Sequence, residues 1–176
     1  PNPDAIRTLV AEGAELIVTV DCGSTSIEAL GVASALGRPA VVLDHHQMGT
    51  ELPPAVAVVN PNRQDDLSGL GYLAAVGVTF LAIVAVNREL RRRGWYGDER
   101  KEPDLLQWLD LVALGTVCDV VPLVGLNRAF VVKGLIALRR GANSGIAALG
   151  RLARIDAPLS PYHLGFLIGP RINAGG

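Results

Sequence analysis

The sequence predicts an α/β fold, in which a parallel sheet made of βαβ units is followed by a mostly helical segment. Short runs rich in β-branched residues occur at 15–20 (ELIVTV), 40–43 (AVVL) and 55–59 (AVAVV), with a helical pattern between the first two. Such continuous apolar runs are typical of strands buried on both faces of a parallel sheet. Later segments are long and have helical spacing. We therefore expect a sheet-containing part at 1–70 and a helical remainder at 71–176.

The first elements follow the order helix, strand, turn, helix, strand. AIRTLVAEGA (5–14) has helical spacing, and the strand at 15–20 leads into the polar turn DCGSTS. The hydroxyls of Ser24 and Thr25 are good helix N-caps, so we expect them to cap the helix IEALGVASALG (27–37). A helix that connects two parallel strands in this way forms a right-handed βαβ unit.

The remainder of the chain is expected to consist of helices joined by short loops. One loop, VCDVVPLVGLN (117–127), is apolar but contains Asp119. Ser144 is expected to cap one of the later helices. The expected helices lie at 72–93, 104–116, 127–141 and 144–155, followed by a short helical or irregular stretch at 160–169.

Composition and charge exclude several classes of protein. Hydrophobic residues make up 49% and charged residues 19% of the 176 residues, which is typical of a globular chain. The formal net charge of −1 provides no overall field for nucleic acid or anionic membranes, so any such contact must be local, as at 88–95 (RELRRRGW) or Arg171. Cys22 and Cys118 lack CxxC spacing, and we expect them to be small buried residues. Each lies beside a candidate metal ligand, so thiolate ligation stays open as an alternative.

One segment has to be considered as a membrane span. Residues 69–86 carry no charge, but their continuous apolar part begins only at Leu73, is interrupted by Gly77 and Thr79, and stops at Asn87. A span takes about 20 apolar residues, so we expect a buried core helix and no membrane contact. The first residues contain no signal-peptide core, and we expect a cytoplasmic protein.

Polar residues at strand ends indicate a site. Asp21 and Asp44 directly follow two successive strands, and the carboxyl ends of parallel strands face one crevice. Asp119 also lies within an apolar run. A carboxylate beside a buried run is costly unless it is paired, hydrogen-bonded or bound to a metal. Each aspartate alone could be a helix or turn cap, but the three together favour a metal site.

The two adjacent histidines extend this interpretation. His45 and His46 follow Asp44 in the segment LDHHQMG, and neighbouring histidines in a loop can point to a metal and to a substrate respectively. Imidazole with carboxylate suits Mn²⁺, Zn²⁺, Fe²⁺ or Co²⁺. A single histidine after a strand is more often an ordinary surface or core residue. The hypothesis of a metal site therefore depends on the two histidines occurring together with the aspartates.

Five motifs occur in a fixed order: VDCGSTS, LDHH, VVNPNR, GTVCDVVPL and GPRINAGG. In this order they resemble the DHH phosphoesterase superfamily and, within it, the RecJ-type single-stranded-DNA-specific exonucleases. The resemblance spans nearly the whole chain. It implies a phosphodiesterase that degrades single-stranded DNA from 5′ to 3′ with two divalent metal ions, Mn²⁺ or Mg²⁺, and acts in DNA repair and recombination.

The resemblance also implies roles for individual residues. Asp21 is expected to bridge both metals, with His45 and Asp119 as further metal ligands. His46 is expected to face the scissile phosphate, and Asp44 to support the histidines. Arg171 is expected to hold substrate phosphate, and Asn173 to assist it. In the parent protein, a single-strand-binding protein or a helicase is an implied partner.

The chain departs from the family at several places. Cys22 stands where the family often has Asn, and Cys118 where a small residue such as Ala is common. The family's first motif, an aspartate cluster of the DxD type on an earlier strand, has no counterpart among Asp4, Glu12 and Glu15. With no initiator Met and a glycine-rich end, the sequence is expected to be a piece of the catalytic core that lacks its first strand and the downstream nucleic-acid-binding domains. We expect such a piece to bind divalent metal weakly and not to cleave DNA by itself.

Two other functions stay open at this point. One is a DHH phosphatase or oligoribonuclease that acts on short nucleotides, although GTVCDVVPL and GPRINAGG speak against it. The other is a non-catalytic binding scaffold with a DHH-like fold. A scaffold has no need to keep Asp21, His45, His46 and Asp119, which makes it the weaker alternative.

Overall fold

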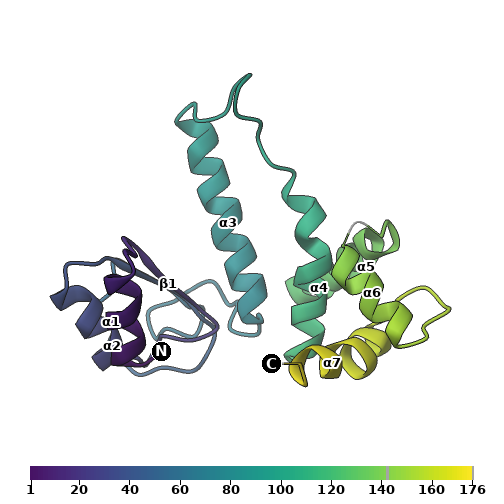
Figure 1. Ribbon diagram of the computed structural model, residues 1–176, viewed down its shortest axis with the longest axis horizontal. Coiled ribbons are helices and arrows are strands. Elements are labelled where there is room, and N and C mark those ends of the chain that lie inside the picture. The colour runs from purple at the N-terminus through teal and green to yellow at the C-terminus, as the bar shows by residue number, and fades with distance from the viewer. Residues whose placement is uncertain (142, 176) are drawn as a thin grey trace. The chain divides into compact units, whose positions relative to one another are not determined.

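The computed structural model describes residues 1–141 and 143–175 (Figure 1). The α/β class is confirmed: β1 (Ile17–Val20), β2 (Ala40–Leu43) and β3 (Ala57–Val59) form a parallel sheet in the order β1-β2-β3. The last glycine of GPRINAGG, Gly176, lies outside the described residues. The chain divides into two compact units, Pro1–Ala82 and Ile83–Gly176, and the boundary predicted at residue 70 stays a prediction.

Two helices cover one face of the sheet in the first unit (Figure 1). α1 (Pro3–Ala11) begins where Asn2 accepts a hydrogen bond from the Ala5 amide at 2.8 Å, with a proline in its first turn. α2 (Ile27–Ala35) connects β1 to β2. The two helices and the strands bury one cluster, whose members are Ile6, Ile17, Ala29, Leu30, Ala33, Ala40 and Val42.

The opposite face of β1 is not covered in the same way. Val18 and Val20 are 49% and 47% exposed, whereas Ile17 and Thr19 are buried. The prediction that every strand is buried on both faces is therefore wrong for β1 in the described part of the chain. The physical reason is that α1 and α2 pack on the face presented by Ile17.

Two predicted helix caps are wrong. The N-cap of α2 is Ser26 rather than Ser24 or Thr25, and Ser24 is buried with its amide bonded to Asp44. The N-cap of α6 (Ser144–Leu152) is Asn143, whose side chain accepts from the Ile146 amide at 3.0 Å. Asn143 caps α6 with its side chain, whereas Ser26 holds the N-cap position of α2 without a side-chain hydrogen bond to the helix.

Helices make up the second unit. α3 (Ala75–Arg92) runs across the boundary between the units, and the expected helix at 72–93 is confirmed to within three residues. The others are η1 (Leu105–Trp108, a 3₁₀ helix), α4 (Leu109–Cys118), α5 (Gly125–Arg139), α6, η2 (His163–Ile168, a π-helix) and α7 (Gly169–Asn173). α4, α5, α6 and η2 share a hydrophobic core, whose buried members are Ala113, Leu114, Val131, Leu138, Ile146, Leu164 and Ile168.

Two further expectations concern the apolar segment and the cysteines. Leu73, Val78 and Phe80 are buried, but Ile83, Val84 and Val86 are exposed, so the expected burial holds only for the first part of the segment. Among the described residues no helix has both the length and the apolar character needed to cross a membrane. Cys22 and Cys118 were predicted to be buried, but both residues are exposed. Cys22 is the second residue after β1, and Cys118 is the last residue of α4, so neither lies in the packed middle of an element.

Candidate metal centre

The three strands end at the same level. Val20 lies opposite Leu43, and Leu43 lies opposite Val59. The ladder continues for one more residue, because the Asp21 amide donates to the Leu43 carbonyl at 2.9 Å and the Asp44 amide donates to the Val59 carbonyl at 3.0 Å. The first residues after the strands are therefore brought to one edge of the sheet, as the strand-end rule predicts.

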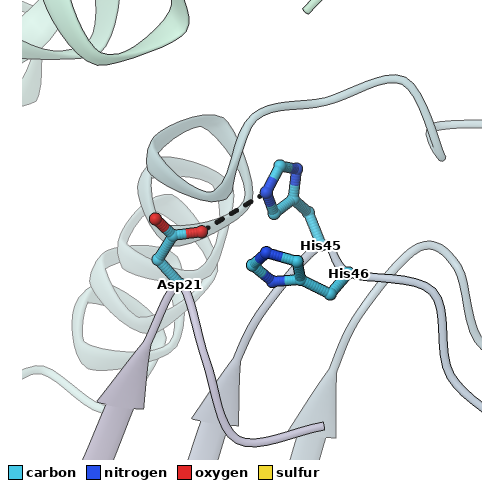
Figure 2. A group of neighbouring side chains, drawn as sticks. All are labelled: Asp21, His45 and His46. Carbon is cyan, nitrogen blue, oxygen red and sulfur yellow. Dashed lines mark ion pairs between the residues drawn. The ribbon is translucent and has the colours of Figure 1, made fainter. Parts of the chain in front are cut away.

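Asp21, His45 and His46 form a cluster at this edge (Figure 2). One potential ligand atom from each lies within 4.8 Å of the others, and the Nε2 atom of His45 lies 3.3 Å from Oδ1 of Asp21. Figure 2 shows Asp21 at the end of β1 and both histidines on the loop that follows β2. A carboxylate with two imidazoles is a donor set suited to Mn²⁺ and similar cations.

The hydrogen bonds of His45 fix which of its nitrogens can act as a ligand. Its Nδ1 atom lies 2.9 Å from the carbonyl oxygen of Leu73, which can only accept. Nδ1 therefore carries a hydrogen, and Nε2 faces Oδ1 of Asp21. In the neutral form of the ring, Nε2 has the lone pair that a metal ion would bind. A metal-binding histidine is commonly oriented by such a carbonyl.

Asp44 lies behind the cluster and is 1% exposed. Its Oδ1 atom accepts from the amides of His45 (2.8 Å) and His46 (3.3 Å) and from His46 Nδ1 (2.7 Å), and Oδ2 accepts from the Ser24 amide at 3.0 Å. Burial by itself would raise the pKa of Asp44, but the hydrogen bonds from His46, Ser24 and His45 outweigh it and hold that pKa well below its usual value. Asp44 is therefore ionised, and it orients His46 so that Nε2 is left for other partners.

Asp21 reaches the cluster through an unusual backbone conformation. Its φ angle is 60°, in the left-handed region that few residues other than glycine adopt. Aspartate tolerates this region better than most side chains do. The chain thus turns sharply after β1, and the carboxylate of Asp21 lies beside His45 (Figure 2).

The remaining predicted site residues belong to the second unit. Asp119 is exposed and is the C-cap of α4, with its amide donating to the Gly115 carbonyl at 2.9 Å. Arg171 and Asn173 lie on α7, where Nη1 of Arg171 donates to the Leu167 carbonyl at 2.6 Å. Their roles beside the first-unit cluster stay predictions.

Sequence reasoning missed Asn60 and Asn62, which follow β3. Asn60 is buried, and its side chain donates to the backbone carbonyl of His46. Asn62 donates to the carbonyl of His45. The signal was present, since Asn60 is the first residue after the third parallel strand, the position that pointed to Asp21 and Asp44 on the other two.

The sequence was compared with known proteins. Residues 1–116 match the family described as "DHH family, N-terminal domain". The chain is 45% identical over 179 residues to the single-stranded-DNA-specific exonuclease RecJ of Salmonella typhimurium, covering 99% of this chain and 31% of that protein. It is 34% identical over 163 residues to RecJ of Thermus thermophilus, covering 93% of this chain and 22% of that protein. The chain thus spans a third or less of the length of these curated relatives.

Solved structures give a similar result. A crystal structure of exonuclease RecJ bound to manganese superposes with a TM-score of 0.79 at 32% identity, covering 99% of this chain and 41% of that chain. RecJ from Thermus thermophilus in complex with Mn²⁺ gives a TM-score of 0.74 at 30% identity, covering 99% of this chain and 24% of that chain.

Proposed function

The chain belongs to the DHH family, and on that premise we propose that it forms part of the catalytic core of a metal-dependent 5′-to-3′ single-stranded-DNA exonuclease. The observation that carries the proposal is the cluster of Asp21, His45 and His46 at the carboxyl edge of the sheet. The similarity to RecJ exonucleases, and to RecJ structures that contain Mn²⁺, supports it.

The proposed cofactor is Mn²⁺ or Mg²⁺ at two sites. Asp21 would bridge them, and His45 Nε2 and Asp119 would complete the ligands that this chain offers. When bound, the cations supply positive charge that offsets the charge of the phosphoryl oxygens. Nε2 of His45 suits this role because its other ring nitrogen is already held by the Leu73 carbonyl.

The other proposed roles concern the DNA strand. Asp44 orients His46 through Nδ1, so that Nε2 of the protonated ring would donate a hydrogen bond or a proton to an oxygen of the scissile phosphate. The guanidinium of Arg171 would bind phosphate, for which its geometry is well suited, and Asn173 would assist it. The partners in this proposal are single-stranded DNA and, in the cell, a single-strand-binding protein or a helicase during DNA repair and recombination in the cytoplasm.

The test is a nuclease assay on the protein that carries this chain, with 5′-labelled single-stranded DNA and Mn²⁺. We expect short products released from the 5′ end. Asp21→Asn and His45→Ala should each lower turnover by more than the roughly 10- to 100-fold that is typical of supporting residues at metal sites. Asp4→Asn and His163→Ala are the matched controls, and both should keep activity. Full activity of His45→Ala, or cleavage of very short nucleotides alone, would contradict the proposal.

A second assay addresses the 176 residues by themselves. We propose that they bind divalent metal weakly and do not cleave DNA, since the family's DxD motif has no counterpart in them. Mn²⁺-dependent turnover by the isolated 176 residues at the rate of the larger protein would overturn this part of the proposal.

A further inference from the structure

Asn60 connects the loops that follow all three strands. It is 3% exposed, and its Nδ2 atom donates to Oγ of Ser24 (2.7 Å), in the loop after β1, and to the carbonyl of His46 (2.9 Å), in the loop after β2. Its Oδ1 atom accepts from the Asn62 amide at 2.8 Å. The donor and the acceptor of this buried amide are therefore both in use.

Asn62 holds the other histidine. Its Nδ2 atom donates to the His45 carbonyl at 2.5 Å and to the Gly71 carbonyl at 3.2 Å. Two residues further along, the Leu73 carbonyl accepts from the ring of His45. The backbone and the imidazole of His45 are thus both tied to the segment at 71–73 that leads into α3.

The backbone of the histidine pair is held almost entirely by side chains. The amides of His45 and His46 donate to Asp44, and their carbonyls accept from Asn62 and Asn60. An asparagine side chain can donate to a carbonyl through Nδ2 and accept from an amide through Oδ1 at once, without carrying a charge. An aspartate in the same place would set a carboxylate against the carbonyl oxygen.

From these contacts we propose that Asn60 and Asn62 are positioning residues of the metal centre, which hold the backbone of His45 and His46 in the orientation that binds a divalent cation. The inference rests on the proposed function for the presence of the cation. The hydrogen bonds themselves do not depend on it. Neither asparagine touches the cation in this proposal, and both act through the histidines.

Asn62→Asp is the first test, on the protein that carries this chain. The change keeps the shape of the side chain and removes both donated hydrogen bonds, so we expect Mn²⁺ affinity, measured from the electron paramagnetic resonance signal of free Mn²⁺, to fall roughly 10- to 100-fold. Gln64→Glu is the matched control, because it adds the same charge to an exposed side chain in the same loop. Its Mn²⁺ affinity should stay within about twofold of the parent value.

Gly71→Ala reaches Asn62 without changing any polar group. A Cβ atom at Gly71 would lie 2.5 Å from Oδ1 of Asn62, so the asparagine side chain has to shift from the position in which it holds the His45 carbonyl. We expect a loss of Mn²⁺ affinity in the same direction as in Asn62→Asp. Gly49→Ala is the control, since no described atom lies within 4 Å of a Cβ at that position. Should Asn62→Asp fail to fold, Gly71→Ala decides the question.

Hydrogen exchange without metal separates the inference from the proposed function. The amides of His45 and His46 should exchange several-fold faster in Asn62→Asp and Gly71→Ala, while those of β1 keep the parent rate. Faster exchange together with weaker Mn²⁺ binding supports the inference. Unchanged affinity in both variants, or equal losses in the controls, overturns it. A parent protein that binds no Mn²⁺ overturns the proposed function and the metal part of the inference, even if exchange at the histidines still depends on the asparagines.

Discussion

Asp21, a predicted metal ligand, has a positive φ angle of 60°. Val120, which directly follows the predicted ligand Asp119, has a positive φ angle of 59°. Valine is particularly unfavourable in this region because its side chain is branched at Cβ. Val120 is also 88% exposed, so packing of its side chain does not offset the free-energy cost of this backbone conformation. Strain of this kind is concentrated at functional sites, where it sets the direction of a side chain. In Asp21 it directs the carboxylate to His45, and beside Asp119 it bends the chain at the end of α4.

Val120→Asn should stabilise the protein. Asparagine adopts the left-handed region at much lower cost than valine, and the exposed side chain gives up few contacts. We expect the free energy of unfolding to rise by about 1 kcal/mol. Denaturant titration measures it, with Val132→Asn as the control, a half-exposed valine inside α5, where valine and asparagine have similar helix propensities. Equal effects at both positions would mean that the backbone angle of Val120 has no influence.

Asp44→Asn should harm both stability and metal binding. The variant loses the negative charge that accepts bonds from three residues and turns an amide donor toward one of them. We expect the free energy of unfolding to fall by about 2–3 kcal/mol and Mn²⁺ affinity to fall as well. Asp98→Asn, an exposed carboxylate, serves as the control in calorimetry and in the Mn²⁺ titration. A stable Asp44→Asn protein would contradict the role given to the buried carboxylate.

At this scale the sequence allowed part of the site to be predicted. Asp21 and Asp44 were found because they follow strands, and the histidines because they follow Asp44. Asn60 occupies the equivalent place after β3, but asparagine beside proline is common in turns, so its sequence context does not indicate a tertiary role. The prediction of Ser24 as a helix cap is wrong because a hydroxyl before a helix is also found in other roles. Its sequence context does not indicate that the buried carboxylate of Asp44 lies next to it.

Helices α4 and α5 cross at very short range. A Cβ atom added to Gly134 would lie 2.2 Å from the Leu109 carbonyl oxygen and 2.3 Å from Cβ of Ala113. Gly134→Ala should therefore destabilise the protein by about 3 kcal/mol, because backbone would have to move. Gly150→Ala, on α6, is the matched control: no described atom lies within 4 Å of its new Cβ, and helix propensity alone should leave stability unchanged or raised. Thermal unfolding of both variants distinguishes crowding from propensity.

The end of α3 is tied to the following loop through Glu102. Its carboxylate pairs with Arg91 and accepts from Nδ2 of Asn87 at 2.8 Å, and the Tyr96 hydroxyl donates to Oδ1 of Asn87 at 2.6 Å. Arg91, and then Asn87, lower the pKa of Glu102 below its ordinary value of 4.5. The stabilisation is therefore complete above pH 4.5 and is lost as the pH falls through the lower, native pKa.

Glu102→Gln should reveal this dependence. At pH 7 we expect the variant to melt at a lower temperature than the parent protein. Below pH 4.5 the difference should shrink, since the parent carboxylate then becomes protonated. Circular dichroism melts over this pH range measure the difference. Glu99→Gln, in the same loop, is the control and should show no such convergence.

Elements could be predicted better than their details. The period of the apolar residues indicated α3 and α5, and the β-branched runs indicated all three strands. The expected stretch at 160–169 contains a π-helix at His163–Ile168, whose wider turn the apolar spacing does not distinguish from an α-helix. Its Leu164 carbonyl lies 3.7 Å from the Cys118 thiol at the end of α4. The loop after α4 is also shorter than predicted, since α4 continues through Cys118 and α5 already begins at Gly125.

For the whole molecule, each unit has a hydrophobic core of its own. The candidate metal centre of the first unit is built at the edge of its sheet, so metal binding should be coupled to the folding of that sheet. Under the proposed function, Mn²⁺ at 100 times its dissociation constant should stabilise the protein by about 2.7 kcal/mol. Calorimetry with Mn²⁺ and with EDTA measures this. In His45→Ala the effect of Mn²⁺ should largely disappear, whereas His163→Ala should keep it.

The level strand ends of the sheet also limit how the chain can change in length. Deleting one residue from β2 would pull Asp44 into the last strand position and turn His45 to the other side of the chain, because side chains alternate along a strand. The exposed residues 49–52 lie between the histidines and β3 and carry no such restriction. Insertions and deletions should therefore be accepted in this loop and rejected in strands only three or four residues long.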